Sequence, residues 1–180
     1  MKVIGLSGSL RAGSHNAKLL RAAGDLLPPE ADLTLYEGLK SIPPFDEDDE
    51  HTRPASVQAL FDAIAQADAV LLATPEYNHS IPGQLKNALD WLSRPLAESP
   101  LRNKPAAVVG TSTGLFGAVW AQAEGRKVLA AIGADVLDRE LPIGMADSAF
   151  HEHGALVDEG HVAALGEILD ELLVRQPVAA

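Results

Sequence analysis

The sequence predicts a doubly wound α/β fold, in which a five-stranded parallel sheet of strand order 2-1-3-4-5 carries helices on both faces. Short apolar runs of strand length alternate with longer stretches whose apolar residues recur at helical spacing. Loops rich in glycine and hydroxyl residues follow strands 1, 3 and 4, at 7–14, 74–83 and 111–117. Ligands of such sheets bind beyond the carboxyl ends of the strands, where the strand order reverses. These loops are therefore expected to form one ligand site.

Length and charge restrict the class of protein. A chain of 180 residues is expected to form a single domain, 1–180. Its net charge of −11 disfavours binding to nucleic acid or to anionic membranes. It contains no cysteine, which excludes disulfides, a thiolate nucleophile and cysteine-bound zinc. No apolar run approaches the ~20 residues of a membrane span, and the chain starts with a strand pattern rather than a signal sequence. The expected location is the cytoplasm.

The first half of the chain is expected to contain two strands and two helices. In order these are strand 2–7, helix 16–27, strand 31–36, loop 38–53 and helix 54–67. Pro28 stops the first helix, and Pro54 suits the first turn of the second. The acidic run from Asp46 to Glu50 is expected to be a solvated part of the loop.

The second half continues the alternation. In order it is expected to form strand 69–73, a helix from Pro82 to Leu92, strand 105–109, a helix after Gly117 whose apolar face runs from Ala121 to Ile132, a weaker strand 136–141, and a helix capped by Asp158 and ended by Pro177. The runs 69–73 and 105–109 are continuously apolar, as is typical of parallel strands buried on both faces. Trp91 and Trp120 lie off the apolar stripes of their helices.

The first loop has the composition of a phosphate site. Backbone N–H groups and a helix N-terminus attract an anion, and small residues let it approach. Arg11 adds a planar cation that suits phosphate oxygens, which matters in so acidic a chain. Gly8 and Gly13 have the spacing of a Walker A loop, but Ser14 stands where that motif needs lysine. The loop therefore favours a phosphomonoester over a triphosphate.

The other two loops suit a planar ring. Tyr77 and Asn78, in a loop stiffened by prolines, are expected to lie along such a ring. The segment 112–117 opens a helix, whose N–H groups and positive end would stabilise negative charge on the ring. A phosphate at one end and a ring that becomes anionic at the other together indicate FMN.

These motifs resemble those of the NADPH-dependent FMN reductase family, which comprises flavodoxin-like quinone, azo and chromate reductases. The resemblance spans about residues 2–142. It is carried by Gly8-Ser9-Leu10-Arg11 with Gly13, Ser14 and Asn16, by Pro75-Glu76-Tyr77-Asn78 with Ser80, Pro82 and Gly83, by 85–91, and more loosely by Ser112-Thr113-Gly114 with Gly117.

The resemblance implies a bound FMN and NADPH or NADH as the hydride donor. The implied cofactor-binding residues are Ser9, Arg11, Ser14 and Asn16 at the phosphate; Pro75, Glu76, Tyr77 and Asn78 at the isoalloxazine ring and ribityl chain; and Ser112, Thr113, Gly114 and Gly117 on the pyrimidine side. No side chain is expected to act as an essential acid or base, because the flavin carries the chemistry. No metal site is expected, because nothing completes a closed ligand set around the late histidines.

The resemblance also implies a reaction and an assembly. Hydride passes from NAD(P)H to flavin N5, and electrons pass on, two at a time, to a quinone, an azo compound, free flavin or a metal oxyanion such as chromate. Homodimers or homotetramers are implied, and Trp91 and Trp120 are candidates for the subunit interface. For each tryptophan taken alone, half-buried packing within the chain is the favoured interpretation. No nucleic acid or membrane partner is expected.

Two other functions fit parts of the sequence. A flavodoxin-type one-electron carrier would have the same fold and would use its acidic surface to dock a redox partner. A serine hydrolase would use Ser112, which lies in a GxSxG motif at 110–114 between a strand and a helix. Its remaining triad members would come from Asp135, Asp138 or Asp147 and from His151, His153 or His161. The late histidines are otherwise expected to be solvated.

Overall fold

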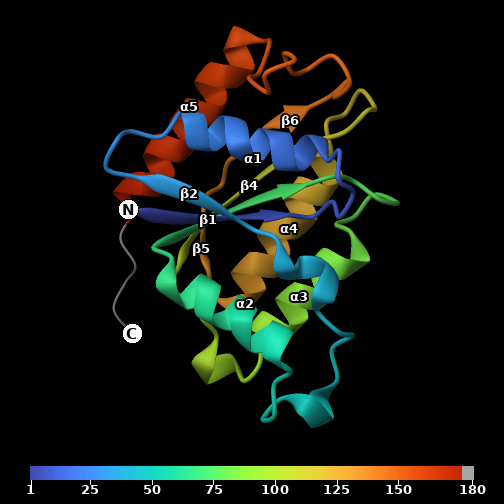
Figure 1. The fold of residues 1–180 in the computed structure, drawn as a ribbon, viewed down its shortest axis with the longest axis vertical. Coiled ribbons are helices and arrows are strands. Elements are labelled where there is room, and N and C mark those ends of the chain that lie inside the picture. Colours follow the sequence, from blue (N-terminus) through green and yellow to red (C-terminus); the bar gives the residue numbers. More distant parts are fainter. Residues whose placement is uncertain (176–180) are drawn as a thin grey trace.

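The computed structural model describes residues 1–175 and has a parallel sheet at its centre (Figure 1). Its strands are β1 (Lys2–Ser7), β2 (Asp32–Tyr36), β3 (Ala69–Thr74), β4 (Pro105–Thr111) and the short β5 (Asp135–Val136) and β6 (Pro142–Ile143). The spatial order is β2-β1-β3-β4-β5, and β6 pairs separately with β4. Every strand pair is parallel. The predicted flavodoxin-like order is confirmed.

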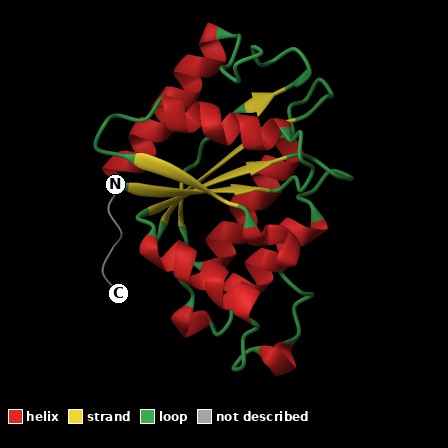
Figure 2. Ribbon diagram, in the orientation of Figure 1, coloured by secondary structure: helices red, strands yellow, loops and turns green. Residues whose placement is uncertain are grey.

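Five α-helices cover the sheet (Figure 2). They are α1 (His15–Asp25), α2 (Ala55–Gln66), α3 (Gly83–Leu92), α4 (Val119–Ile132) and α5 (Glu159–Val174). One apolar cluster joins α1 and α5 to one face of the sheet, and a second joins α2, α3 and α4 to the other. The sequence predicts each helix to within a few residues.

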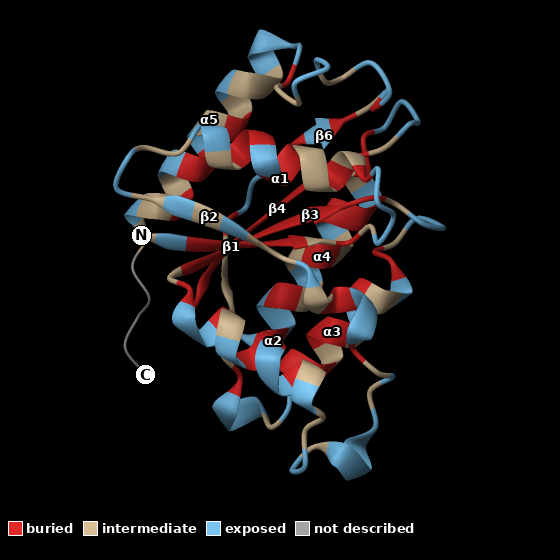
Figure 3. Cartoon of the chain, in the orientation of Figure 1, coloured by how far each residue is buried: buried red, intermediate tan, exposed pale blue. Residues whose placement is uncertain are grey.

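The two central strands hold the core. Every residue of β3 and β4 is buried, which confirms the prediction of strands covered on both faces (Figure 3). Interiors of this kind are close-packed and resist local movement. The carboxyl ends of these strands therefore provide a rigid edge, and the loops that leave them start from fixed positions.

The loop after β2 folds back over α3. It contains the 3-10 helices η1 (Gly38–Ser41) and η2 (Glu47–Asp49), and the acidic residues of η2 are exposed, as expected. Trp91 is only 1% exposed: its Nε1–H donates to the Pro43 carbonyl at 2.9 Å, and its ring packs edge-on against Phe45. This loop buries Trp91 within its own chain, which agrees with packing as the favoured interpretation and removes Trp91 as a candidate for the subunit interface.

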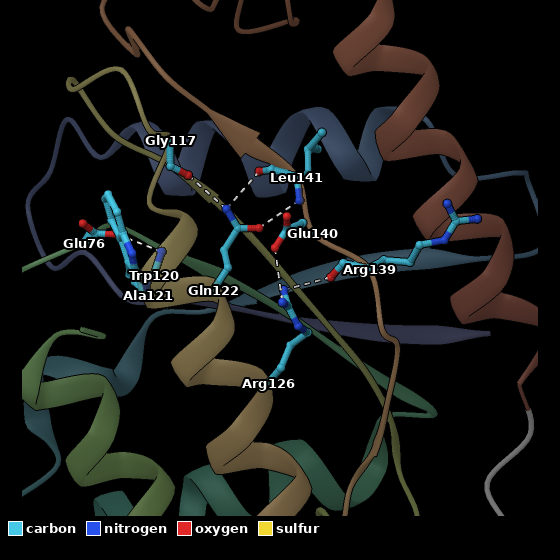
Figure 4. A network of polar contacts seen from close by, with 9 residues as sticks. All are labelled: Glu76, Gly117, Trp120, Ala121, Gln122, Arg126, Arg139, Glu140 and Leu141. Carbon is cyan, nitrogen blue, oxygen red and sulfur yellow. Dashed lines mark hydrogen bonds and ion pairs between the residues drawn. The ribbon is translucent and has the colours of Figure 1, made fainter. Parts of the chain in front are cut away.

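The predicted fifth strand, 136–141, is interrupted. Only β5 and β6, near the two ends of this segment, form strands paired with β4, and two side chains of α4 bind the backbone between them (Figure 4). The Gln122 amide accepts from the Leu141 N–H at 2.8 Å and donates to the Leu141 carbonyl at 3.2 Å. Arg126 donates to the Arg139 carbonyl at 3.2 Å and to the Glu140 carboxylate at 3.2 Å. The predicted strand is therefore formed only in part, and contacts from α4 satisfy part of the backbone in the gap.

The last helix begins as predicted. Asp158 caps α5, because its carboxylate accepts from the His161 N–H at 2.8 Å. Pro177, the expected end signal, lies outside the described residues. None of the helices in the described part of the chain combines the length and apolar character that crossing a bilayer requires.

Replacing Gln122 tests its role in the fold. Gln122 is fully buried and also donates to the Gly117 carbonyl at 2.9 Å. Gln122→Leu leaves three buried backbone groups without these partners and is expected to lower the free energy of unfolding by about 2–4 kcal/mol in urea denaturation. The matched control is Gln58→Leu at an exposed position of α2, where only a contact to Asp62 is lost and the change should stay below about 0.5 kcal/mol. Equal effects would contradict the assignment.

Candidate functional site

The three predicted loops meet at one edge of the sheet. They connect β1 to α1, β3 to α3 and β4 to α4, and they lie together at the right of Figure 1. A cavity of about 150 Å³ opens between them. It is lined by Ser9, Arg11, His15, Asn16, Pro75, Glu76, Tyr77, Thr111, Ser112 and Thr113. Eight of these ten residues are among those assigned to the cofactor from the sequence.

The first loop lies tightly against the second. The Gly8 N–H donates to the Ala73 carbonyl at 2.8 Å, and a Cβ added to Gly8 would lie 3.0 Å from Leu85 and 3.2 Å from Pro75. A glycine at this position therefore lets the two loops approach. Ser14 caps α1 by accepting from the Ala17 N–H at 3.1 Å. The N-terminus of α1 and its unshared N–H groups border the cavity, where they favour an anion.

Arg11 provides the cation of this loop. Its guanidinium is exposed and donates to the Gly13 carbonyl at 3.0 Å. This contact folds the side chain back over its own loop and leaves further N–H groups of the fork for a ligand. A planar cation beside a helix N-terminus is a donor set that fits a phosphate.

Asn16 joins the first loop to the third. Its side chain is 2% exposed, its Nδ2–H donates to the Thr111 carbonyl at 3.0 Å, and its Oδ1 accepts from the Thr111 N–H at 3.1 Å. The structure thus places the Asn16 amide on the backbone of β4, where it positions the start of α1. Asn16 would therefore support phosphate binding indirectly, by fixing the position of the α1 N-terminus.

The second loop contains a tight turn. Tyr77 and Ser80 exchange backbone hydrogen bonds at 3.0 and 3.2 Å, and Asn78 and His79 between them have φ of +54° and +61°. Two consecutive positive φ values are those of a type I′ turn, in which asparagine is favoured. The turn leaves Tyr77 at the cavity and half exposed.

Glu76 ties the second loop to the third. Its Oε2 accepts from the N–H groups of Trp120 at 3.1 Å and Ala121 at 3.3 Å, at the start of α4 (Figure 4). The residue that precedes α4 is Ala118, which has no side chain able to cap it. The Glu76 carboxylate therefore supplies the cap from a different loop.

The third loop is packed closely against β6. Gly117 has φ of +56°, and a Cβ there would overlap the backbone of Pro142. The Ser112 N–H donates to the Ile143 carbonyl at 3.1 Å.

Four residues assigned to the cofactor from the sequence do not line the cavity: Ser14, Asn78, Gly114 and Gly117. Of these, Ser14 and Gly117 instead shape the loops that do.

Two residues that line the cavity, His15 and Thr111, were not predicted from the sequence. Thr111 is the last residue of β4, and a hydroxyl residue at the carboxyl end of an apolar strand was the available signal. His15 is the first residue of α1, directly after the capping serine. Its position at a helix start was the corresponding signal.

The structure does not assemble a serine hydrolase triad. The Ser112 hydroxyl donates to the Gly114 carbonyl at 3.4 Å. Of the candidate histidines, His151 and His153 stack on each other with ring centroids 5.2 Å apart, and His161 lies 3.8 Å from the carboxylate that caps α5.

Within residues 1–175, no three His, Asp or Glu residues are placed to share a metal ion.

The profile of the NADPH-dependent FMN reductase family matches residues 1–148. The chain belongs to this family. The match contains all three loops of the site and ends before the late histidines. Membership overturns the hydrolase interpretation, and the donor set of Arg11 and the α1 N-terminus fits the phosphate of the family's cofactor, FMN.

Several known oxidoreductases are similar to the chain over most of its length. An NAD(P)H-dependent FMN reductase of Pseudomonas aeruginosa is 43% identical over 161 residues, which cover 88% of this chain and 86% of that protein. A quinone reductase of Escherichia coli K12 is 34% identical over 185 residues, which cover 97% of this chain and 98% of that protein. The solved structure of FerB, a flavoenzyme NAD(P)H:(acceptor) oxidoreductase from Paracoccus denitrificans, superimposes with a TM-score of 0.84 at 35% identity, covering 97% of this chain and 96% of FerB.

Removing the Glu76 carboxylate tests how the second and third loops are joined. Glu76→Ala leaves the first N–H groups of α4 without this acceptor and is expected to lower the free energy of unfolding by about 1–2 kcal/mol in urea. Glu76→Gln keeps an acceptor oxygen and should lose less. The control is Glu124→Ala on the same helix, whose surface pair with Lys127 should contribute below about 0.5 kcal/mol. A Glu76→Ala protein as stable as this control would contradict the capping role.

Proposed function

We propose that this chain is an NAD(P)H-dependent FMN oxidoreductase that passes electrons, two at a time, to quinones. The observation that carries the proposal is the meeting of the three loops of the family motif around one cavity at the carboxyl edge of the sheet. The bound flavin supplies hydride and electron transfer. The chain's own residues bind and orient it, and none is assigned as an acid or base.

Each of the three loops binds a different part of FMN. Ser9, Arg11 and the N-terminus of α1 bind the phosphate, with Ser14 and Asn16 holding that loop in place. The second loop, 75–78, lies along the isoalloxazine ring. The third, 112–114, faces the pyrimidine side, where the nearby start of α4 favours the negative charge of a reduced ring.

The names of relatives support a quinone as the acceptor. The Escherichia coli relative is named a quinone reductase, and a Burkholderia relative of 35% identity is named a 2-hydroxy-1,4-benzoquinone reductase. Azo compounds, free flavin and chromate are further acceptor classes to be assayed beside quinones.

We also propose a homodimer or homotetramer of a single-domain chain in the cytoplasm. Large apolar side chains are exposed around the third loop: Leu115 is 77%, Phe116 66% and Trp120 43% exposed. Contiguous exposed apolar groups at a functional site favour association. Trp120 therefore stays a candidate for the interface, whereas Trp91 does not.

The spectrum of the purified protein tests the proposed activity. A yellow protein is expected whose flavin absorption bleaches when NADPH is added without oxygen and returns when a quinone follows. A flavin that NADPH leaves oxidised, but that dithionite reduces in two separate one-electron steps, would indicate an electron carrier instead. A colourless protein that takes up no added FMN would contradict the proposal altogether.

Arg11 tests where the phosphate binds. Arg11→Ala removes charge-assisted hydrogen bonds and is expected to raise the Kd for FMN about tenfold while leaving the Kd for riboflavin unchanged, because riboflavin has no phosphate. Quenching of flavin fluorescence measures both constants. Arg21→Ala, on α1 after the loop, controls for a general loss of positive charge and should change neither. A loss of riboflavin affinity equal to that of FMN would place Arg11 elsewhere.

A further inference from the structure

A hollow of about 540 Å³ lies between α1 and β2 and shares no lining residue with the cofactor cavity (Figure 1). Its walls come from α1 between Lys18 and Asp25, from residues 31–35 and from the turn at 153–154. Its volume falls within the ~300–1,000 Å³ that is typical of small-molecule sites. The proposed flavin chemistry uses none of these residues, so the hollow is a candidate site for a second, separate ligand.

The α1 wall of this hollow carries charges that have no partner in the chain. Arg21 and Asp25 are four residues apart on α1, the spacing at which opposite charges on a helix commonly pair. The same order of charges does pair on α3, where Lys86 Nζ lies 2.6 Å from Asp90. Within residues 1–175, neither Arg21 nor Asp25 forms an ion pair, and the same holds for Lys18. These charges are therefore available to a ligand.

The turn at 151–154 adds a third donor to the two cations of α1. The Gly154 N–H donates to the His151 carbonyl at 2.9 Å, and Gly154 has φ of +97°, a conformation that favours glycine. The His153 ring stacks on His151 with centroids 5.2 Å apart and planes at 7°. The turn thus holds an imidazole at the hollow, where a ring N–H can donate to an anion. Ammonium, guanidinium and imidazole donors together suit the oxygens of a phosphate group.

The hollow also has an acidic part and an apolar part. Asp32, at the start of β2, lines it together with Asp25 at the end of α1, and Asp32 has no ion pair in the described chain either. A carboxylate only accepts hydrogen bonds, so this part repels a phosphate and favours a donor such as a hydroxyl group. Leu33 and Leu35 are half-buried and present apolar surface beside the buried Leu20.

We propose that this hollow binds a nucleoside monophosphate. The cations of α1 and the imidazole bind its phosphate, the two carboxylates accept from its ribose hydroxyl groups, and the base packs against the leucines of β2. Simpler ligands leave part of the hollow unused. Inorganic phosphate reaches neither the carboxylates nor the apolar wall, and a neutral nucleoside leaves the cations without a partner.

Titration calorimetry with AMP tests the inference on protein saturated with FMN, so that the phosphate loop is already occupied. AMP is expected to bind with a Kd below about 1 mM. Adenosine and ribose 5-phosphate should each bind at least about fivefold more weakly, because each lacks one of the recognised parts. Lys18→Ala and Arg21→Ala should each raise the Kd for AMP about tenfold. The controls are Lys40→Ala and Arg102→Ala, which remove exposed cations that do not line the hollow and should leave this Kd unchanged.

Asp32→Ala separates a ribose contact from a bystander charge. Loss of an acceptor for a ribose hydroxyl should raise the Kd for AMP about threefold, whereas the Kd for inorganic phosphate should fall because a repulsion is removed. Tighter binding of AMP to this variant would overturn the assignment of the ribose.

Three further results would overturn the inference. They are the absence of AMP binding, equal affinities for AMP and ribose 5-phosphate, and a Kd for AMP that Lys18→Ala and Arg21→Ala leave unchanged. The proposed function is tested separately. A protein that binds AMP in this way but does not pass electrons from NADPH to a quinone would refute the proposed function alone, and the reverse result would refute this inference alone.

Discussion

The site depends on one buried amide. The side chain of Asn16 bonds both backbone groups of Thr111 and so joins the start of α1 to the end of β4, although β3 lies between β1 and β4 in the sheet. Because the amide is buried, breaking either bond would leave polar groups without water as a replacement partner. The first and third loops are therefore held at a fixed separation before any ligand arrives. Preorganisation of this kind lowers the entropic cost of binding.

Other contacts fix the second loop against this pair. Gly8 lets the first loop approach Pro75, and the Glu76 carboxylate caps α4 at the end of the third loop. The chain between 143 and 150 adds a further connection, since the Ala146 N–H donates to the Ser112 carbonyl at 3.0 Å and Asp147 contacts His15. Each loop of the cavity is thus held by another part of the chain rather than by its own sequence alone.

The features that were predicted from the sequence are local or topological. Apolar runs and helical spacing located β1, β3 and β4, and parallel strands necessarily bring the loops at their carboxyl ends to one edge. That geometry made it possible to assign Ser9, Arg11 and Tyr77 to a common site before their positions were known. The phosphate loop was equally predictable, because its glycine, serine and arginine residues are close together in the sequence.

The features that were missed depend on contacts distant in sequence. Gln122 and Arg126, on a neighbouring helix, bind the backbone where the fifth strand is interrupted. The Pro43 carbonyl accepts a hydrogen bond from Trp91, whose side chain lies off the apolar stripe of its own helix. The pairing of Asn16 with Thr111 spans 95 residues, and no spacing rule indicates it. Such side-chain to backbone contacts become visible only when the fold is known.

A structure of the chain crystallised with FMN tests the central claim most directly, namely that the three preorganised loops form the flavin site. We expect the phosphate at Arg11 and the N-terminus of α1, the ring beside Tyr77, and the Asn16 amide still bonded to the backbone of Thr111. A larger surface hollow of about 540 Å³ lies between α1 and β2, where Lys18 and Arg21 are also available to an anion. Flavin bound there, with the three loops empty, would contradict the account.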